Sequence, residues 1–348
     1  MVHGNTTEMA TEVARSECGL VRTIACAGAI VQDVYLRTEL APKGGIVTAG
    51  AVEYALGGAP GNVSRCLARL GVAAEAVACV GDDGPGRWLR GTLDSMGVGT
   101  SRLSTVADSP TGVSAILVTP DGDRTIYCYP GANDRFDGHQ ITGDEGWSVC
   151  HLGYPPLLPR CQGEALARLF RRLQGRGVMT SLDTVVSSAA QPLEEIAPAL
   201  RYTDVFTPNL EEASQLTGLD AGPDALASAD AAAGRLLSYG VGLVAITLDA
   251  QGAYVATSDA VADGPTRRRR PWPSGLRRAI PGYDVQGTLN TTAAGDSFTA
   301  GLLASLLRSL TPEHAARAGN LAAALSVEGS PLPPLDDLLD LVQRRPTR

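Results

Sequence analysis

Strands and helices alternate through the middle of this 348-residue chain, and this alternation limits the possible folds more than any other feature. Short apolar runs predict strands over residues 148–152, 178–182, 204–208 and 243–248. Apolar residues at helical spacing predict helices over residues 163–173, 191–200, 210–217 and 224–239. Because strands that are joined by helices run parallel in one sheet, the chain is expected to form a mostly parallel sheet with helices on both faces.

The first half of the chain adds β-rich segments to this plan. A strand is expected over residues 23–28, and a helix follows the glycine-rich turn at residues 57–62. Two further segments, residues 34–56 and 111–133, interrupt the alternation and contain a strong hairpin signal. We expect them to pair into a small β-rich lid over one end of the sheet.

Three parts of the domain organisation follow from composition along the chain. Residues 1–20 are polar and predict a flexible N-terminal tail, and residues 21–348 predict one domain. Residues 262–282 are rich in proline and arginine and predict a basic loop. Such a charge run usually forms a solvated surface, but this one precedes the strand that leads to Asp296, so contact of Arg267–Arg270 with a phosphate is also open.

A helix that starts beside Asp296 carries the strongest chemical signal. Ala293, Ala294 and Gly295 are small, and the apolar pattern of a helix follows Asp296. The first N–H groups of a helix have no partner within the helix and favour an anion. A carboxylate in this first turn is placed to act as a general base, although it could also serve only to compensate the helix dipole. Asp33 and Asn209 fall at the same edge of the expected sheet, where ligands bind in such folds.

Composition excludes several other classes of protein. The net charge of −8 argues against a general nucleic-acid or anionic-membrane surface. The seven cysteines are scattered without a C-x-x-C pair, which favours reduced thiols in a cytoplasmic protein. No apolar run is long enough for a membrane span, and the N-terminal residues do not resemble a secretion signal. The chain also lacks a P-loop, a protein-kinase signature set, a dinucleotide-binding turn and an H-E-x-x-H motif.

Several motifs, taken in their order along residues 21–335, resemble those of the ribokinase-like carbohydrate kinase family of the phosphofructokinase-B type. The turn from Gly57 to Asn62 looks like the first family signature, and Ala294-Gly295-Asp296 looks like the second. Asn209 to Glu212 resembles the N-x-x-E motif. The resemblance implies a ribokinase-like three-layer α/β/α sandwich with a mostly parallel sheet and a small lid. It also implies a kinase that uses ATP and Mg²⁺.

The resemblance implies a role for each matching residue. Asp296 would be the catalytic base, with Ala293, Ala294 and Gly295 as the anion hole. The substrate-binding residues would be Asp33, Gly57, Gly58 and Asn62, and Tyr154 is expected to line the same pocket. The nucleotide-binding residues would be Asn209, Thr247, Asp249, Gly252 and Asn320. Glu212, together with Asn209, would hold Mg²⁺ through water.

The chain departs from the family pattern at a few positions. Ala293 stands where many members have glycine, and its methyl group need not block the backbone donors if its φ is negative. Asn290 replaces an aspartate that helps to hold K⁺ in cation-activated members, and the loop at residues 326–330 is about one residue short. Both changes argue against activation by K⁺. Asp249 replaces a usual glycine and adds negative charge near the expected triphosphate.

These features predict an ATP-dependent kinase that phosphorylates a hydroxyl, expected to be a hydroxymethyl, of a small sugar or sugar-like acceptor. The Gly-Ala-Pro-Gly-Asn form of the first signature favours fructokinase-like or ribokinase-like sugar kinases. A nucleoside kinase of the same family is the leading alternative, and a non-catalytic sugar-binding or regulatory relative is a second. The open edges of the lid strands also make a homodimer through the lid plausible.

Overall fold

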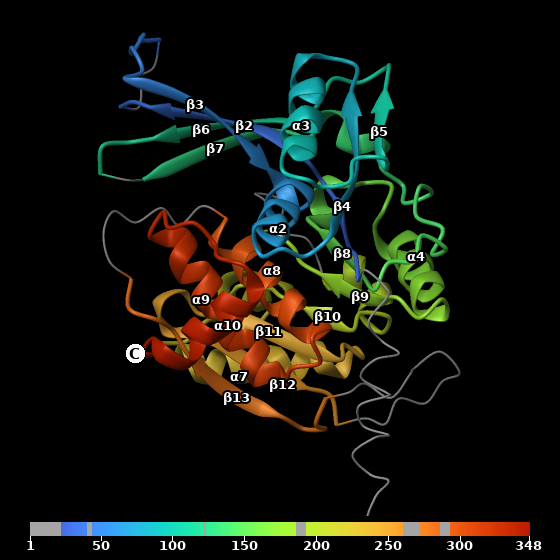
Figure 1. Cartoon of the computed structure of the whole chain (residues 1–348), viewed down its shortest axis with the longest axis vertical. Coiled ribbons are helices and arrows are strands. Elements are labelled where there is room, and N and C mark those ends of the chain that lie inside the picture. Colours follow the sequence, from blue (N-terminus) through green and yellow to red (C-terminus); the bar gives the residue numbers. More distant parts are fainter. Residues whose placement is uncertain (1–21, 40–43, 122, 186–192, 260–271, 286–292) are drawn as a thin grey trace, which may run out of the picture.

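The computed structural model describes residues 22–39, 44–121, 123–185, 193–259, 272–285 and 293–348. The predicted tail, Arg267–Arg270 and Asn290 lie outside these residues. A nine-stranded sheet and a four-stranded sheet form the framework of the described chain (Figure 1). No helix in these ranges is both long and apolar enough to cross a bilayer.

The nine-stranded sheet has the order β13-β12-β11-β10-β9-β8-β1-β4-β5. Its strands are β1 (Ile24–Gly28), β4 (Ala74–Gly81), β5 (Leu103–Val106), β8 (Val149–Gly153), β9 (Met179–Leu182), β10 (Val205–Phe206), β11 (Leu243–Thr247), β12 (Gly252–Thr257) and β13 (Arg277–Pro281). All neighbours from β5 to β11 are parallel, while β12 and β13 are antiparallel. Every residue of β1 and β8 is buried, and all of them except His151 are apolar or glycine, as expected for strands that are buried on both faces.

Helices cover both faces of this sheet. One core cluster joins it to α2 (Gly58–Arg69), α3 (Gly84–Ser95), α8 (Ala294–Leu307), α9 (Pro312–Val327) and α10 (Leu335–Arg344). A second cluster joins the opposite face to α4 (Gly163–Gly175), α5 (Leu193–Leu200), α6 (Leu210–Thr217) and α7 (Ala225–Ser238). This arrangement confirms the predicted three-layer α/β/α architecture with a mostly parallel sheet.

The smaller sheet confirms the expected lid. Its strands are β2 (Val31–Arg37), β3 (Ala51–Gly57), β6 (Val113–Val118) and β7 (Arg124–Tyr129), in the order β3-β2-β6-β7. The sheet projects away from the main body of the molecule (Figure 1). In the strand register, Asp33 pairs with Ala55 and Ser114, so these residues share one face.

The predicted basic loop at residues 262–282 is only partly a loop, and this expectation needs correction. Residues Arg277–Pro281 form β13, the edge strand of the large sheet, and pair with β12. Arg277 forms an ion pair with Asp230 of α7, which is how charge is accommodated at this edge. The segments α3, β5 and β12 were also not predicted, because each is short or lacks a distinct apolar period.

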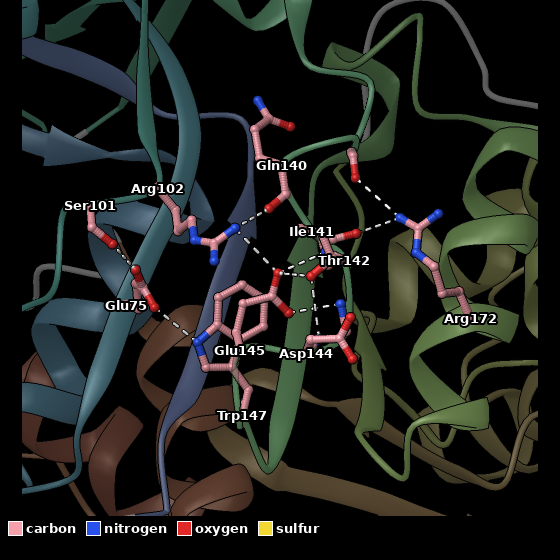
Figure 2. Close-up of polar contacts among 12 residues, drawn as sticks. Glu75, Ser101, Arg102, Gln140, Ile141, Thr142, Asp144, Glu145, Trp147 and Arg172 are labelled. Carbon is pink, nitrogen blue, oxygen red and sulfur yellow. Dashed lines mark hydrogen bonds and ion pairs between the residues drawn. The ribbon is translucent and has the colours of Figure 1, made fainter.

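A polar network holds the loop before β8 at the amino-terminal end of the large sheet (Figure 2). The Glu145 carboxylate accepts hydrogen bonds from the backbone N–H groups of Thr142 and Gly143, both at 2.7 Å. It also lies 3.3 Å from the guanidinium of Arg102, with only 3% of the Glu145 side chain exposed. Because parallel strands carry ligands at their carboxyl ends, this network at the opposite end has a structural role.

The six described cysteines, Cys26, Cys66, Cys79, Cys128, Cys150 and Cys161, are free thiols. Burial raises the pKa of Cys79 to about 11, and it also raises the pKa of Cys26. Such thiols stay protonated and unreactive near neutral pH. The five buried cysteines therefore match the expectation of reduced thiols packed as small apolar residues, whereas Cys128 is exposed and Cys18 lies outside the described residues.

Candidate active site

Asp296 lies in the first turn of α8, at the helix end that favours an anion. Ala293 is the N-cap residue and has no side chain that can satisfy the first N–H groups of the helix. A Cβ added at Gly295 would meet no atom within 4 Å, so open space lies in front of this turn. The turn therefore has the features of an anion hole, namely free backbone donors and room for a ligand.

The backbone at Ala293 differs from the expectation of a negative φ. Its φ is 60°, in the left-handed region that glycine adopts readily and that costs other residues roughly 1–2 kcal/mol. Only four described residues other than glycine have a positive φ, and three of them, Tyr154, Asp249 and Ala293, are expected site residues. Strained backbone of this kind collects at functional sites.

The carboxylate of Asp296 is held by two side chains from other elements. Asn62, on α2, donates from Nδ2 to Oδ2 at 2.9 Å. The Tyr154 hydroxyl lies 3.2 Å from Oδ1 and 3.1 Å from Oδ2. Asp296 is only 4% exposed, so these contacts replace most of its hydration.

This environment sets the protonation of Asp296. Burial raises its pKa to about 6, against the opposing effects of the hydrogen bonds from Asn62 and Tyr154 and of the Arg65 charge. A carboxylate with this pKa is ionised at neutral pH and yet more basic than an exposed aspartate. Those are the properties that a general base requires.

The glycine-rich turn before α2 has a clear structural reason. A Cβ at Gly57 would collide with the Asp33 carboxylate, and a Cβ at Gly58 would collide with the carbonyl oxygen of Ala29. Gly58 also has a φ of +75°. These glycines therefore let the lid carboxylate and the start of α2 approach each other closely. Asn62, one turn into the helix, then reaches Asp296.

Asp33, on lid strand β2, lies close to Asp296. It is 7% exposed, and burial raises its pKa to about 6 while a hydrogen bond with Ser114 acts in the opposite direction. The charges of Asp296 and Arg65 also affect this pKa, so Asp33 lies near both groups. The lid and helix α8 thus each bring one buried carboxylate to the same region.

Asn209 and Glu212 form a complete capping box at the start of α6. The Asn209 side chain accepts from the N–H of Glu212, and the Glu212 carboxylate accepts from the N–H of Asn209, both at 2.8 Å. The N-x-x-E pattern therefore has a structural function of its own. The pattern also brings the carboxylate of Glu212, which is 9% exposed, close to the site.

A fourth buried carboxylate, Asp183, follows β9. Burial, together with the nearby charges of Glu212 and Asp296, raises its pKa well above the ordinary value. A set of close carboxylates that has only Arg65 as a nearby cation in the described chain is an environment that a bound cation would stabilise. In the described chain, no three or more such side chains are arranged to ligate a metal directly. The site therefore fits Mg²⁺ only when water lies between the ion and the protein.

The expected nucleotide-binding residues lie around the ends of β11 and β13. Thr247 ends β11 and bridges to Asn209, and Asp249 is exposed with a φ of 49°. Gly252 is packed so closely against Ile280–Gly282 that a Cβ would collide with the backbone there.

The Asn320 amide is already engaged within the protein. Its Nδ2 donates to the carbonyl oxygens of Ile280 and Pro281, at 3.1 and 3.0 Å. Gly252 and Asn320 thus both pack against the end of β13. This structural role accounts for both residue types, and their contact with a nucleotide stays a prediction.

Two residues at the site were missed in the sequence. Arg65 lies one helical turn after Asn62, and its Nη2 is 3.4 Å from the Asn62 Oδ1. Its buried Nε has no hydrogen-bond partner. The i, i+3 spacing from Asn62 could have identified Arg65. Asp183 could have been identified as a carboxylate directly after a predicted parallel strand.

Comparison with known proteins agrees with this geometry. The profile of the family described as "pfkB family carbohydrate kinase" matches residues 21–331. Ribokinase of Haemophilus influenzae is 29% identical over 310 residues, which cover 88% of this chain and 92% of that protein.

Two solved structures share the fold. Arabidopsis thaliana ribokinase, solved with ribose and ATP, has a TM-score of 0.74 and 22% identity, with 93% of this chain and 99% of that chain covered. Methanocaldococcus jannaschii nucleoside kinase has a TM-score of 0.71 and 19% identity, with 94% and 100% covered. The match of the profile to almost all of the described structure establishes that this chain belongs to the pfkB family of carbohydrate kinases.

Proposed function

We propose that this protein transfers the γ-phosphate of ATP to a hydroxyl, expected to be a hydroxymethyl, of a small sugar or sugar-like acceptor. The observation that supports this most directly is Asp296. Its buried carboxylate, with a pKa of about 6, stands at the open N-terminus of α8. A base and an anion hole within one helical turn are what phosphoryl transfer to an alcohol requires.

In the proposed reaction Asp296 accepts the proton of the acceptor hydroxyl as its oxygen attacks the γ-phosphorus. A new P–O bond forms to the acceptor, the bond from the γ-phosphorus to the bridging oxygen breaks, and ADP leaves. The N–H groups of residues 294–296 stabilise the charge on the migrating phosphoryl group. Small residues at 293–295 leave this backbone accessible.

Mg²⁺, when bound, offsets the negative charge of the phosphates. Glu212 and Asn209 would hold it through water, and Asp183 adds a further nearby carboxylate. Thr247, Asp249, Gly252 and Asn320 are proposed to border the nucleotide.

Asp33 and Asn62 are proposed to orient the acceptor, with Gly57 and Gly58 shaping the space beneath the lid. The two carboxylates, Asp33 and Asp296, face only one nearby cation, Arg65 in the described chain. This charge balance favours a neutral polyhydroxylated acceptor over a sugar phosphate, because a phosphate would meet net negative charge. Closure of the lid would exclude water and limit hydrolysis of ATP.

A nucleoside acceptor is the second candidate. It is supported by the resemblance in fold to the M. jannaschii nucleoside kinase. A nucleoside presents a neutral ribose with a hydroxymethyl group, so the same charge argument accommodates it.

A homodimer through the lid is a further part of the proposal. Strands β3 and β7 are the outer strands of the lid sheet in the described chain. Tyr54 and Tyr127, on the face opposite Asp33, are 55% and 65% exposed. A second copy would cover this apolar surface. A mass of one 36.0 kDa chain in solution at micromolar concentration would contradict the dimer.

The test is ADP release with Mg-ATP against neutral sugars, sugar acids, sugar phosphates, cyclitols and nucleosides, each with and without K⁺. We expect turnover on a neutral sugar or nucleoside, no dependence on K⁺, and loss of at least about 100-fold in kcat for Asp296→Ala. Retention of more than about a tenth of kcat in that variant would refute the assigned base. Binding of sugars without turnover across the panel would favour a non-catalytic role.

A further inference from the structure

Tyr154 meets the Asp296 carboxylate in a way that its place in the sequence does not predict. The sequence predicts only that Tyr154 lines the acceptor pocket. In the structure its hydroxyl lies within hydrogen-bond distance of both carboxylate oxygens of Asp296. The phenol therefore contacts the carboxylate that we propose as the base.

The backbone at Tyr154 carries strain that supports this contact. Its φ and ψ are 63° and 52°, in the left-handed region, directly after β8 and directly before Pro155. A residue before proline is also restricted away from helical conformations. Strain of this kind persists where the surrounding structure over-determines it. A right-handed or extended backbone here would direct the side chain elsewhere.

We propose that Tyr154 is a positioning residue for the base, whose hydroxyl, with the amide of Asn62, keeps Asp296 ionised and oriented with Oδ1 toward the acceptor hydroxyl. This inference rests on the proposed role of Asp296. Asn62 engages Oδ2, so Oδ2 receives two donors whereas Oδ1 receives only Tyr154. Oδ1 therefore has the larger remaining capacity to accept a proton.

The phenol remains a donor throughout the pH range of an assay. Burial and the neighbouring Asp296 charge raise the pKa of Tyr154 well above its ordinary value. A protonated phenol that donates to a carboxylate stabilises the ionised form of that carboxylate. Tyr154 thus opposes the effect of burial on Asp296, in the same direction as Asn62.

Other groups around Asp296 also affect its protonation. From α2, the Arg65 cation favours the ionised carboxylate. Asp183 after β9 and Asp33 on β2 are nearby carboxylates that interact with Asp296, and their pKa values are raised. The Cys26 and Cys66 thiols also lie near Asp296. Burial raises their pKa values, so they stay neutral.

The first experiment compares the pH profile of kcat/KM for the wild type, Tyr154→Phe and Tyr254→Phe. Tyr254→Phe is a matched control, because the Tyr254 hydroxyl also donates to an aspartate, Asp230, on α7. We expect Tyr154→Phe to move the acid limb upward by about one pH unit, a loss of about fivefold at pH 6 that approaches tenfold at lower pH, with recovery near pH 8. The control should keep the wild-type limb. A uniform loss at every pH, or an unchanged profile, would overturn the proposal.

The second experiment needs no turnover. Thermal midpoints are measured at pH 5 and pH 8 for the wild type, Tyr154→Phe, Asp296→Asn and the double variant. Removal of the donor raises the Asp296 pKa further, so the destabilisation by Tyr154→Phe should grow from pH 5 to pH 8. In the Asp296→Asn background that growth should vanish. Equal destabilisation at both pH values would show that Tyr154 only packs, which contradicts the inference.

The two experiments also separate the inference from the proposed function. If Asp296→Asn keeps its activity, the assigned base is wrong, whereas the midpoint cycle still measures the coupling of Tyr154 to Asp296. If Asp296→Asn is inactive but Tyr154→Phe leaves the acid limb and the cycle unchanged, only the inference on Tyr154 fails.

Discussion

Replacement of Asp296 by asparagine should make the protein more stable at pH 8 while it abolishes activity. The pKa of Asp296 is raised from 3.8 to about 6, chiefly by burial. The folded state therefore binds this proton more tightly than the unfolded state. Its contribution to stability is full below pH 3.8 and is lost as the pH rises through 6. Asparagine does not ionise, so the variant does not lose this stability at high pH.

The magnitude follows from the size of the shift. About two pKa units correspond to about 3 kcal/mol above pH 7, and about half of that at pH 5. The asparagine amide presents an N–H donor where the carboxylate only accepted hydrogen bonds, so the variant loses one hydrogen bond. This loss reduces the gain in stability by about 1 kcal/mol. The net gain is about 2 kcal/mol at pH 8 and well under 1 kcal/mol at pH 5. For a chain of this length, 2 kcal/mol raises the thermal midpoint by about 3 °C.

Thermal or urea unfolding at the two pH values measures this gain. The matched control is Asp230→Asn on α7. The hydrogen bond from Tyr254 and the ion pair with Arg277 hold the pKa of Asp230 below its usual value, so the control should lose stability at pH 8. The reasoning fails if Asp296→Asn is no more stable than the wild type at pH 8, or if its gain is the same at pH 5.

Three further substitutions test the backbone conformation at Ala293, the packing at Gly58 and the buried carboxylate of Glu145. Ala293→Gly should raise the free energy of unfolding by about 1 kcal/mol, because φ is 60° at this position. Activity should be kept because the backbone donors remain, and a lower urea midpoint would contradict the prediction. Gly58→Ala should lower the free energy of unfolding by more than about 3 kcal/mol, because its Cβ would collide with Ala29. Gly71→Ala is the control, since Gly71 has a similar φ of +72° but lies in open space, and it should cost about 1 kcal/mol. Equal losses of stability in the two variants would show that the contact with Ala29 is unimportant. Glu145→Gln should cost about 2 kcal/mol at pH 7, with kcat unchanged. Although desolvation acts to raise it, hydrogen bonds from Thr142 lower the pKa of Glu145 below its ordinary value of 4.5. Its stabilisation should therefore decrease as the pH falls below 4.5, and a cost that persists in full at low pH would refute this.

The expected architecture was accurate where the apolar pattern was long and regular. Strand β1 is buried on both faces, and a continuous apolar run is the direct signature of that burial. Where a strand was short or charged the pattern failed. Arg277–Pro281 reads as part of a basic loop, and only pairing with β12 and the ion pair with Asp230 make it a strand.

Most residues of the candidate site could be predicted from the sequence, but the contacts between them could not. Asp296 was predicted from local chemistry that is visible in the chain, namely small residues, a carboxylate and a helix start. Asn62 was predicted from the family resemblance, and Asp33 from its place at the sheet edge and from the same resemblance. The partners of these residues were not visible. Asn62 was expected to bind the acceptor, yet its amide donates to Asp296, which lies 234 positions away in the chain.

The sequence alone thus determined which elements form, because helical and strand periods are local, and which residue types gather at one edge of the sheet. The tertiary structure decided how those residues meet. It placed the Tyr154 hydroxyl on Asp296 and put Ala293 in a left-handed conformation. Each of these outcomes depends on the relative placement of elements that are distant in the chain, or on backbone angles set by packing. No local pattern encodes either.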